Sequence, residues 1–181
     1  MTNLFPIEKQ AAFPLFGRFT HAYRNEFFSR WPLLESFDID IFTVDEYLGL
    51  PNEILRKVMI DDIREQSFAS FIYKKEVAIE TTNAGIIYNE SLIRQLGLTE
   101  SEQFAAIAHE IGHILYFFLE NKRDYPELQG EEIYADKLAC EIGLAAEMLS
   151  TIEKLERSGI SRDPINQFRM RKCMIINVFL K

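Results

Sequence analysis

Cysteine is scarce in this sequence, with only Cys140 and Cys173 among 181 residues. Two thiols do not make a disulfide framework, so we expect both to be reduced core residues and predict a cytoplasmic location. Long apolar runs are also missing, because His109, Glu110 and His113 interrupt the longest one, and no charged-then-apolar leader opens the chain. We therefore expect neither a membrane span nor a standard secretion signal.

Basic residues are in the minority, with 20 Lys and Arg against 28 Asp and Glu and a net charge of −8. This balance argues against a phosphate-binding surface, so no nucleic acid or membrane partner is expected. The charge is uneven, since residues 36–66 hold eight acidic and three basic side chains, whereas 151–181 hold three acidic and seven basic ones. Two solvated helical faces are the simplest interpretation. A basic C-terminal contact with an acidic regulatory protein is the alternative.

The residues that are abundant are those of a folded globule, with 48% apolar residues, 15 Phe and 7 Tyr. We predict one α+β domain over residues 1–181, of which 1–66 are mainly helical. Aromatic side chains in 1–35 are expected to pack over a core, and Pro51 to open a helix ending near Gln66. Three β-like runs follow, and they predict a short antiparallel meander. The runs lie near 68–73, 76–81 and 85–89.

Helix signals are clear in the second half of the chain. Thr99 and Glu102 have the spacing of a capping box and predict the start of a helix that is apolar nearly all round through Leu119. We expect this helix to be the buried centre of the domain. The polar stretch 121–130 reads as a loop, and Asp163-Pro164 can begin a last helix over about 164–178. The segment 151–181 is thus a C-terminal helical part.

Histidine is rare too, yet two of the three histidines fall in one motif, His109-Glu110-Ile111-Gly112-His113. On a helix, residues four apart lie about 40° apart around the axis, so both imidazoles share a face that suits one tetrahedral metal ion. Glu110 lies about 60° from His113, which leaves its carboxylate beside the metal as a general base rather than a ligand. Two buried histidines held by hydrogen bonds are the alternative.

The next helix offers a third ligand. Glu132 lies 19 residues after His113, far enough for a loop to turn and a second helix to return with a carboxylate. Asp136, one turn later on the same face, can accept the second ring N–H of a ligating histidine. We predict one zinc ion per chain on His109, His113 and Glu132, although these ligand types also accommodate other divalent ions.

Small residues on this second helix predict close packing. A narrow stripe is expected to face the histidine helix, where Gly112 leaves room for a neighbouring backbone. The stripe consists of Glu132, Ala135, Asp136, Ala139 and Gly143.

These motifs together resemble the gluzincin class of zinc metallopeptidases, in which an H-E-x-x-H helix precedes an E-x-x-x-D helix. The closest likeness is to the ImmA/IrrE-type peptidases, and it covers about residues 67–150, which would form a zincin-like core. The segments that carry it are 85–90 (GIIYNE), 99–113 and 131–136 (EEIYAD). The resemblance implies His109, His113 and Glu132 as zinc ligands and Glu110 as the catalytic glutamate. A further His common in the family is absent here, as is a helix-turn-helix module.

The predicted function is hydrolysis of peptide bonds in a protein or peptide substrate, by Glu110-assisted attack of zinc-bound water. By resemblance to zincins, the 85–89 run is the candidate edge strand for an extended substrate. Tyr88 and Tyr116 are possible oxyanion donors, a role left unassigned, and His21 is expected to be a surface or core residue. A zinc-dependent hydrolase of another amide or ester, and a non-catalytic zinc-stabilised binding module, are the alternatives.

Overall fold

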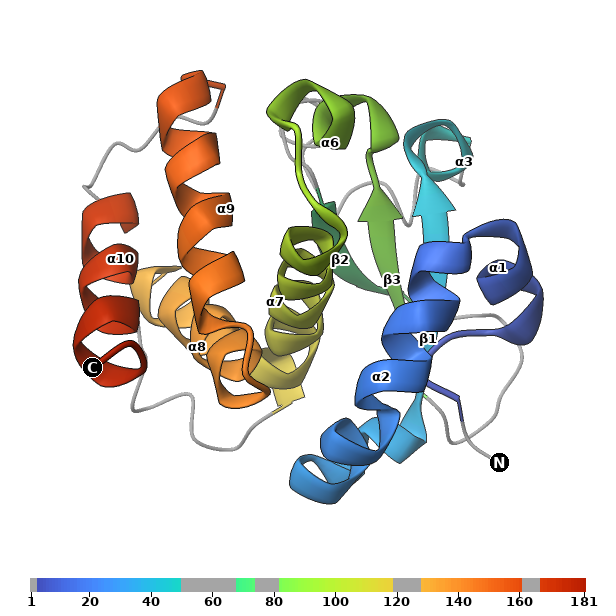
Figure 1. The fold of residues 1–181 in the computed structure, drawn as a ribbon. Coiled ribbons are helices and arrows are strands. Elements are labelled where there is room, and N and C mark those ends of the chain that lie inside the picture. Colours follow the sequence, from blue (N-terminus) through green and yellow to red (C-terminus); the bar gives the residue numbers. More distant parts are fainter. Residues whose placement is uncertain (1–2, 50–67, 74–81, 119–127, 161–166) are drawn as a thin grey trace. The chain divides into compact units, whose positions relative to one another are not determined.

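The computed structural model describes residues 3–49, 68–73, 82–118, 128–160 and 167–181, and Figure 1 shows its helices and strands. The fold is mixed α+β and mostly helical, as predicted. The chain divides into two compact units, Met1–Arg64 with Ala69–Tyr88, and Glu65–Phe68 with Asn89–Lys181. The boundary at residue 88 falls inside the segment predicted as the zincin core. The single-domain assignment stays a prediction.

The first unit contains the helices α1 (Ile7–Ala12) and α2 (Pro14–Arg30), a 3-10 turn η1 (Pro32–Ser36) and the short helix α3 (Val44–Leu48). Phe16, Phe19 and Phe27 of α2 are fully buried, so these three aromatic residues belong to the core as expected, whereas Phe13, Tyr23, Phe28 and Trp31 are half-buried. His21, by contrast, lies on the exposed face of the helix.

The strands of this unit correct one prediction. β1 (Phe37–Thr43) pairs in parallel with β3 (Thr82–Tyr88), in the register Ile39↔Ala84 and Ile41↔Ile86. The prediction of an antiparallel sheet is therefore wrong, because the pairing described in this sheet is parallel. The strand missing from the prediction is β1, although Phe37, Ile39 and Ile41 are buried and alternate with two half-buried aspartates, which is the alternation of a strand.

The sheet order is β1-β3-β2, with β2 over Phe68–Tyr73. The predicted runs at 68–73 and 85–89 are thus strands, whereas the run at 76–81 and the helix after Pro51 lie outside the described residues. Because β3 has a neighbour on each side, its segment 85–89 is not the free edge that was predicted to pair with substrate. Tyr88 packs edge-on against Phe13 and Phe16, with ring centroids 5.9 and 5.4 Å away.

The second unit is helical, and Figure 1 shows helices of this unit packed side by side. It comprises α6 (Glu90–Leu96), α7 (Glu100–Phe118), α8 (Leu128–Glu141), α9 (Ala145–Ser158) and α10 (Gln167–Val178). The helix α7 contacts both α8 and α9, and the helix α10 contacts the same two. Buried side chains all round α7, from Ala105 to Leu115, make it the central helix, as predicted.

The boundaries of these helices follow local signals. Thr99 and Glu102 form the predicted capping box of α7, with the Thr99 N–H donating to Glu102 Oε2 at 2.6 Å and the Glu102 N–H donating to Thr99 Oγ1 at 3.3 Å. The predicted loop 121–130 is wrong at its end, because α8 already begins at Leu128. The predicted last helix is found as α10, and its proposed cap at Asp163 lies outside the described residues.

Two further expectations concern the cysteines and membrane-spanning helices. Cys140 is buried and Cys173 exposed, and both are free thiols, as expected, whereas a core position for Cys173 is wrong. No helix within the described ranges has the length and apolar character needed to cross a membrane.

Candidate metal centre

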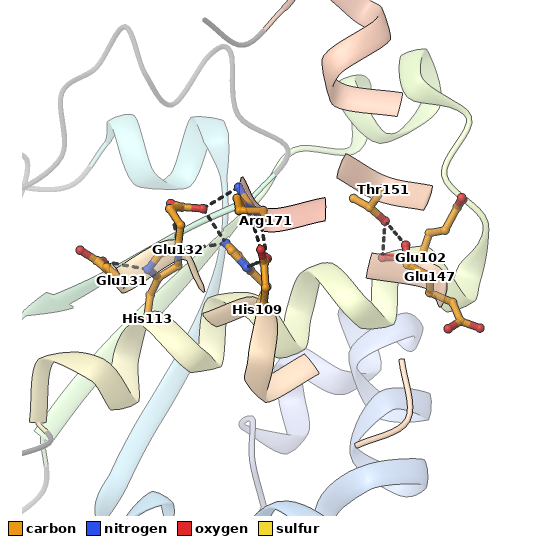
Figure 2. Close-up of polar contacts among 9 residues, drawn as sticks. Glu102, His109, His113, Glu131, Glu132, Glu147, Thr151 and Arg171 are labelled. Carbon is orange, nitrogen blue, oxygen red and sulfur yellow. Dashed lines mark hydrogen bonds and ion pairs between the residues drawn. The ribbon is translucent and has the colours of Figure 1, made fainter. Parts of the chain in front are cut away.

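The two motif histidines lie on α7 with their rings 4.6 Å apart, centroid to centroid. Their Nε2 atoms face each other at 2.9 Å, and each lies 3.5 Å from an oxygen of Glu132 on α8. The ligand atoms of His109, His113 and Glu132 form the one cluster of potential metal-binding side chains found among the described residues. The helical spacing of four and the return of a second helix therefore bring together the three predicted ligands, as Figure 2 shows.

Close contact between α7 and α8 makes this meeting possible. A Cβ added to Gly112 would lie only 2.6 Å from Ala135 Cα, so the two backbones touch at the place where glycine faces alanine. Ala135 and Ala139 are fully buried, and the small-residue stripe is confirmed there. It is wrong at Gly143, which is exposed and lies beyond the end of α8, where its φ of 90° belongs to the turn before α9.

A carboxylate holds the outer nitrogen of each histidine. His109 Nδ1 lies 2.8 Å from Asp136 Oδ1, which is the contact predicted for this residue. His113 Nδ1 lies 2.8 Å from Glu131 Oε1, a contact that was not predicted. An ionised carboxylate can only accept, so both Nδ1 atoms carry the hydrogen, and each Nε2 of a neutral ring presents a lone pair toward the centre.

The centre therefore gathers acceptors that a proton or a metal ion could bridge. Two Nε2 lone pairs 2.9 Å apart, each 3.5 Å from a different oxygen of the Glu132 carboxylate, cannot satisfy each other, whereas a proton or a metal ion between them can. Tetrahedral ligands about 2.0–2.1 Å from zinc would be roughly 3.3 Å apart. The observed 2.9 and 3.5 Å bracket that value, so the donor set fits a zinc ion.

The pKa values of His113 and Asp136 both shift toward the charged form of the side chain, because each has partners of opposite charge. Burial opposes the protonation of His113, but the hydrogen bond to Glu131 and the charges of Glu132 and Glu110 outweigh it and raise its pKa to about 9. Burial opposes the charge of Asp136 too, yet the Arg171 guanidinium and the His109 hydrogen bond lower its pKa to about 2. Without a metal, a proton on His113 would occupy the gap between the acceptors.

Glu110 lies next to His109 on α7 and is only 7% exposed. Its charge is close enough to raise the pKa of both His113 and Arg171, which places the carboxylate beside the cluster. It is not one of the three clustered ligand residues. This is the position expected of a base beside a metal rather than of a ligand.

Arg171, on α10, is the residue that the sequence interpretation missed. It is 5% exposed and contacts both Asp136 and Glu132. The sequence feature that could have indicated it is its helical spacing from Phe168 and Ile175, which places all three on one face of α10. That face is buried, and a charged residue is unexpected there. Tyr116 packs on Tyr134 with ring centroids 5.6 Å apart, which gives it a packing role and leaves the oxyanion donor unassigned.

The chain matches no protein-family model, and no curated protein or solved structure is significantly similar to it. The interpretation of the site therefore depends on its own geometry and on the motif resemblance.

Proposed function

We propose that this protein is a zinc-dependent peptidase of the gluzincin type, similar to the ImmA/IrrE peptidases, that hydrolyses peptide bonds in a protein substrate. One observation carries the proposal. Three metal-ligand atoms converge from two helices, each histidine is held by its own carboxylate, and a buried Glu110 lies beside them.

The residues divide the chemistry among them. His109, His113 and Glu132 would hold the zinc ion, which when bound acts as a Lewis acid and makes water a stronger acid. The Glu110 carboxylate accepts the proton from the attacking water and delivers it to the nitrogen of the leaving amine. Asp136 and Glu131 keep the two imidazoles in the tautomer that presents Nε2 to the centre.

Two features favour catalysis over a purely structural zinc site. Structural zinc is almost always held by four protein ligands, whereas the cluster found in the described part of the chain has three, which leaves a position for water or substrate. A structural site also has no use for a base, yet Glu110 is a buried carboxylate next to the ligands. Burying that charge is costly, so a functional reason for its position is expected.

Peptide bonds are the preferred substrate class because of the motif resemblance. A free strand edge at 85–89 does not support this substrate class, since β3 is a central strand. A zinc-dependent hydrolase of another amide or ester thus stays the second candidate. The test must include both substrate classes.

The test compares the wild type with Glu110→Gln, and uses Glu141→Gln on the surface of α8 as the matched control. Zinc content is measured by elemental analysis, and cleavage is measured on unfolded proteins, lysate proteins and small amide and ester substrates. We expect one zinc per chain in all three proteins and equal cleavage of proteins by the wild type and Glu141→Gln. Glu110→Gln should be at least about 100-fold slower, because it loses the base.

Other outcomes identify the alternatives. Glu110-dependent cleavage of small amides or esters alone would replace the peptidase by the second candidate. Zinc in the wild type without hydrolysis of either class would contradict the catalytic proposal and favour a structural site. A wild-type protein that binds no zinc would contradict the metal centre itself.

A further inference from the structure

Arg171 is a buried cation on the helix that follows the metal-binding pair. Its side chain is 7% exposed, and its neighbours along the same helix face are Phe168 and Ile175, which are also buried. A charge in such a position costs free energy unless ionised partners compensate it. The partners of Arg171 are two carboxylates of the metal centre.

All three guanidinium nitrogens are used. Nε donates to Asp136 Oδ2 at 2.6 Å and Nη2 donates to Asp136 Oδ1 at 2.7 Å, which makes a bidentate pair. Nη1 lies 2.7 Å from Glu132 Oε2. One planar group thus fixes the direction of two carboxylates that lie one helical turn apart.

Each of these carboxylates acts on the centre by a different route. Asp136 Oδ1, which accepts from Arg171, also accepts from His109 Nδ1 at 2.8 Å and so sets the direction of the His109 ring. Glu132 Oε2, which faces Arg171 Nη1, lies 3.5 Å from His109 Nε2. Arg171 therefore contacts the carboxylate that holds the His109 imidazole on α7 and also contacts Glu132 on α8. Figure 2 shows Arg171 beside His109 and Glu132.

We propose that Arg171 is the positioning residue of the metal centre, which couples the docking of the C-terminal helix α10 to metal binding through Asp136 and Glu132. The inference rests on the proposed zinc site and adds to it a residue 35 positions beyond Asp136 in the chain. Arg171 contacts no reacting atom. It acts by holding ligands in place, and the planar fork of its guanidinium is essential, because a lysine ammonium cannot form the same three contacts.

The first test uses Arg171→Lys, Arg171→Met and the matched control Arg169→Met, which removes an exposed charge from the same helix. Zinc affinity is measured by competition with a chelator, and the visible spectrum of the cobalt-loaded protein reports the ligand geometry. We expect both Arg171 variants to bind zinc at least about 10-fold more weakly than the wild type and to show an altered cobalt spectrum. Arg169→Met should match the wild type in both.

The lysine variant separates positioning from simple charge balance. If Arg171→Lys retains wild-type zinc affinity and the wild-type cobalt spectrum, the positioning role is overturned. A wild-type protein that binds no zinc overturns the proposed function and this inference together. Zinc in the wild type with unchanged affinity in the variants overturns the inference alone.

A second test needs no variant and decides the matter if the substituted proteins do not fold. Coupling is reciprocal, so zinc must favour the docking of α10 as much as docked α10 favours zinc. Hydrogen exchange of the wild type with and without zinc should slow in α10 by at least about 5-fold more than in α6, which contributes no residue to the centre. Equal slowing in α10 and α6 overturns the proposal.

Discussion

Single residues decide how the two histidines face the centre. Each ring is held by one carboxylate at 2.8 Å, but the two carboxylates differ in environment. Asp136 is completely buried and shared with Arg171, whereas Glu131 is 20% exposed. The His109–Asp136 hydrogen bond is therefore part of a buried charge network that includes Arg171. The His113–Glu131 hydrogen bond belongs to a half-buried pair.

This difference predicts unequal effects for two isosteric substitutions. Asp136→Asn should lower zinc affinity about 10- to 100-fold and the free energy of unfolding by about 3 kcal/mol, because buried Arg171 loses its bidentate partner. Glu131→Gln should lower zinc affinity also, but should cost less than about 1 kcal/mol of stability, since its site is partly hydrated. Chelator competition and urea unfolding measure the two quantities. Asp136→Asn with wild-type values for both would contradict this account.

At the scale of elements, the site depends on how closely α7 approaches α8. The proposed zinc ligands come from both helices, so the separation of the backbones sets the distance between imidazoles and carboxylates. Gly112 and Ala135 form the point of contact, because a Cβ at position 112 would lie 2.6 Å from Ala135 Cα. The sequence predicted this contact from small residues at helical spacing.

Gly112→Ala should consequently force α7 and α8 apart. We expect a loss of about 1–3 kcal/mol in the free energy of unfolding, and weaker zinc binding because both ligand helices move. Gly17→Ala on α2 is the matched control, since its added Cβ would lie 3.6 Å from the nearest atoms, an ordinary contact. Alanine's better helix propensity should make that variant equal to or up to about 1 kcal/mol more stable than the wild type. Calorimetry with and without zinc tests both, and equal behaviour of the two variants would contradict the close-contact argument.

At the scale of the whole molecule, the stability of this acidic protein depends on buried carboxylates that hydrogen-bond donors keep in the ionised form. Glu102 is such a carboxylate, and it lies away from the proposed metal centre. It caps α7, and it accepts hydrogen bonds from two residues of α9, from Lys154 Nζ at 2.7 Å and from Ser150 Oγ at 2.6 Å. Burial opposes its ionisation, but these donors outweigh burial and lower its pKa to about 2. A lowered pKa in the folded state stabilises the fold above the unfolded value of about 4.5.

That contribution should disappear on acidification. Glu102→Gln should be less stable than the wild type by the order of 1–3 kcal/mol at pH 6, and the difference should shrink as the pH falls from about 4.5 toward 2, where the wild-type carboxyl becomes protonated. Unfolding curves across this pH range measure the difference. Glu153→Gln, which affects an exposed pair with Arg157, is the control and should change stability by less than about 1 kcal/mol. A difference independent of pH would contradict the role given to Glu102.

Features that depend on local spacing could be predicted from the amino-acid sequence alone. A helix places residues four apart on one face whatever surrounds it, so His109 and His113 could be paired, and Thr99 and Glu102 had to form a capping box once α7 began there. Asp136, one turn after Glu132, followed from the same periodicity.

Contacts between segments that are distant in the sequence could not be predicted in this way, because they depend on how the helices and strands pack. The parallel pairing of β1 with β3 joins residues more than 40 positions apart. Strands pair through backbone hydrogen bonds, so the sequence of one strand does not identify its partner. The contact between Arg171 and Asp136 is a second example. It forms only because α10 packs on α8, and the sequence does not specify that packing. Local periodicity thus predicted the proposed zinc ligands, whereas helix packing brings Arg171 to the carboxylates that it is proposed to hold in place.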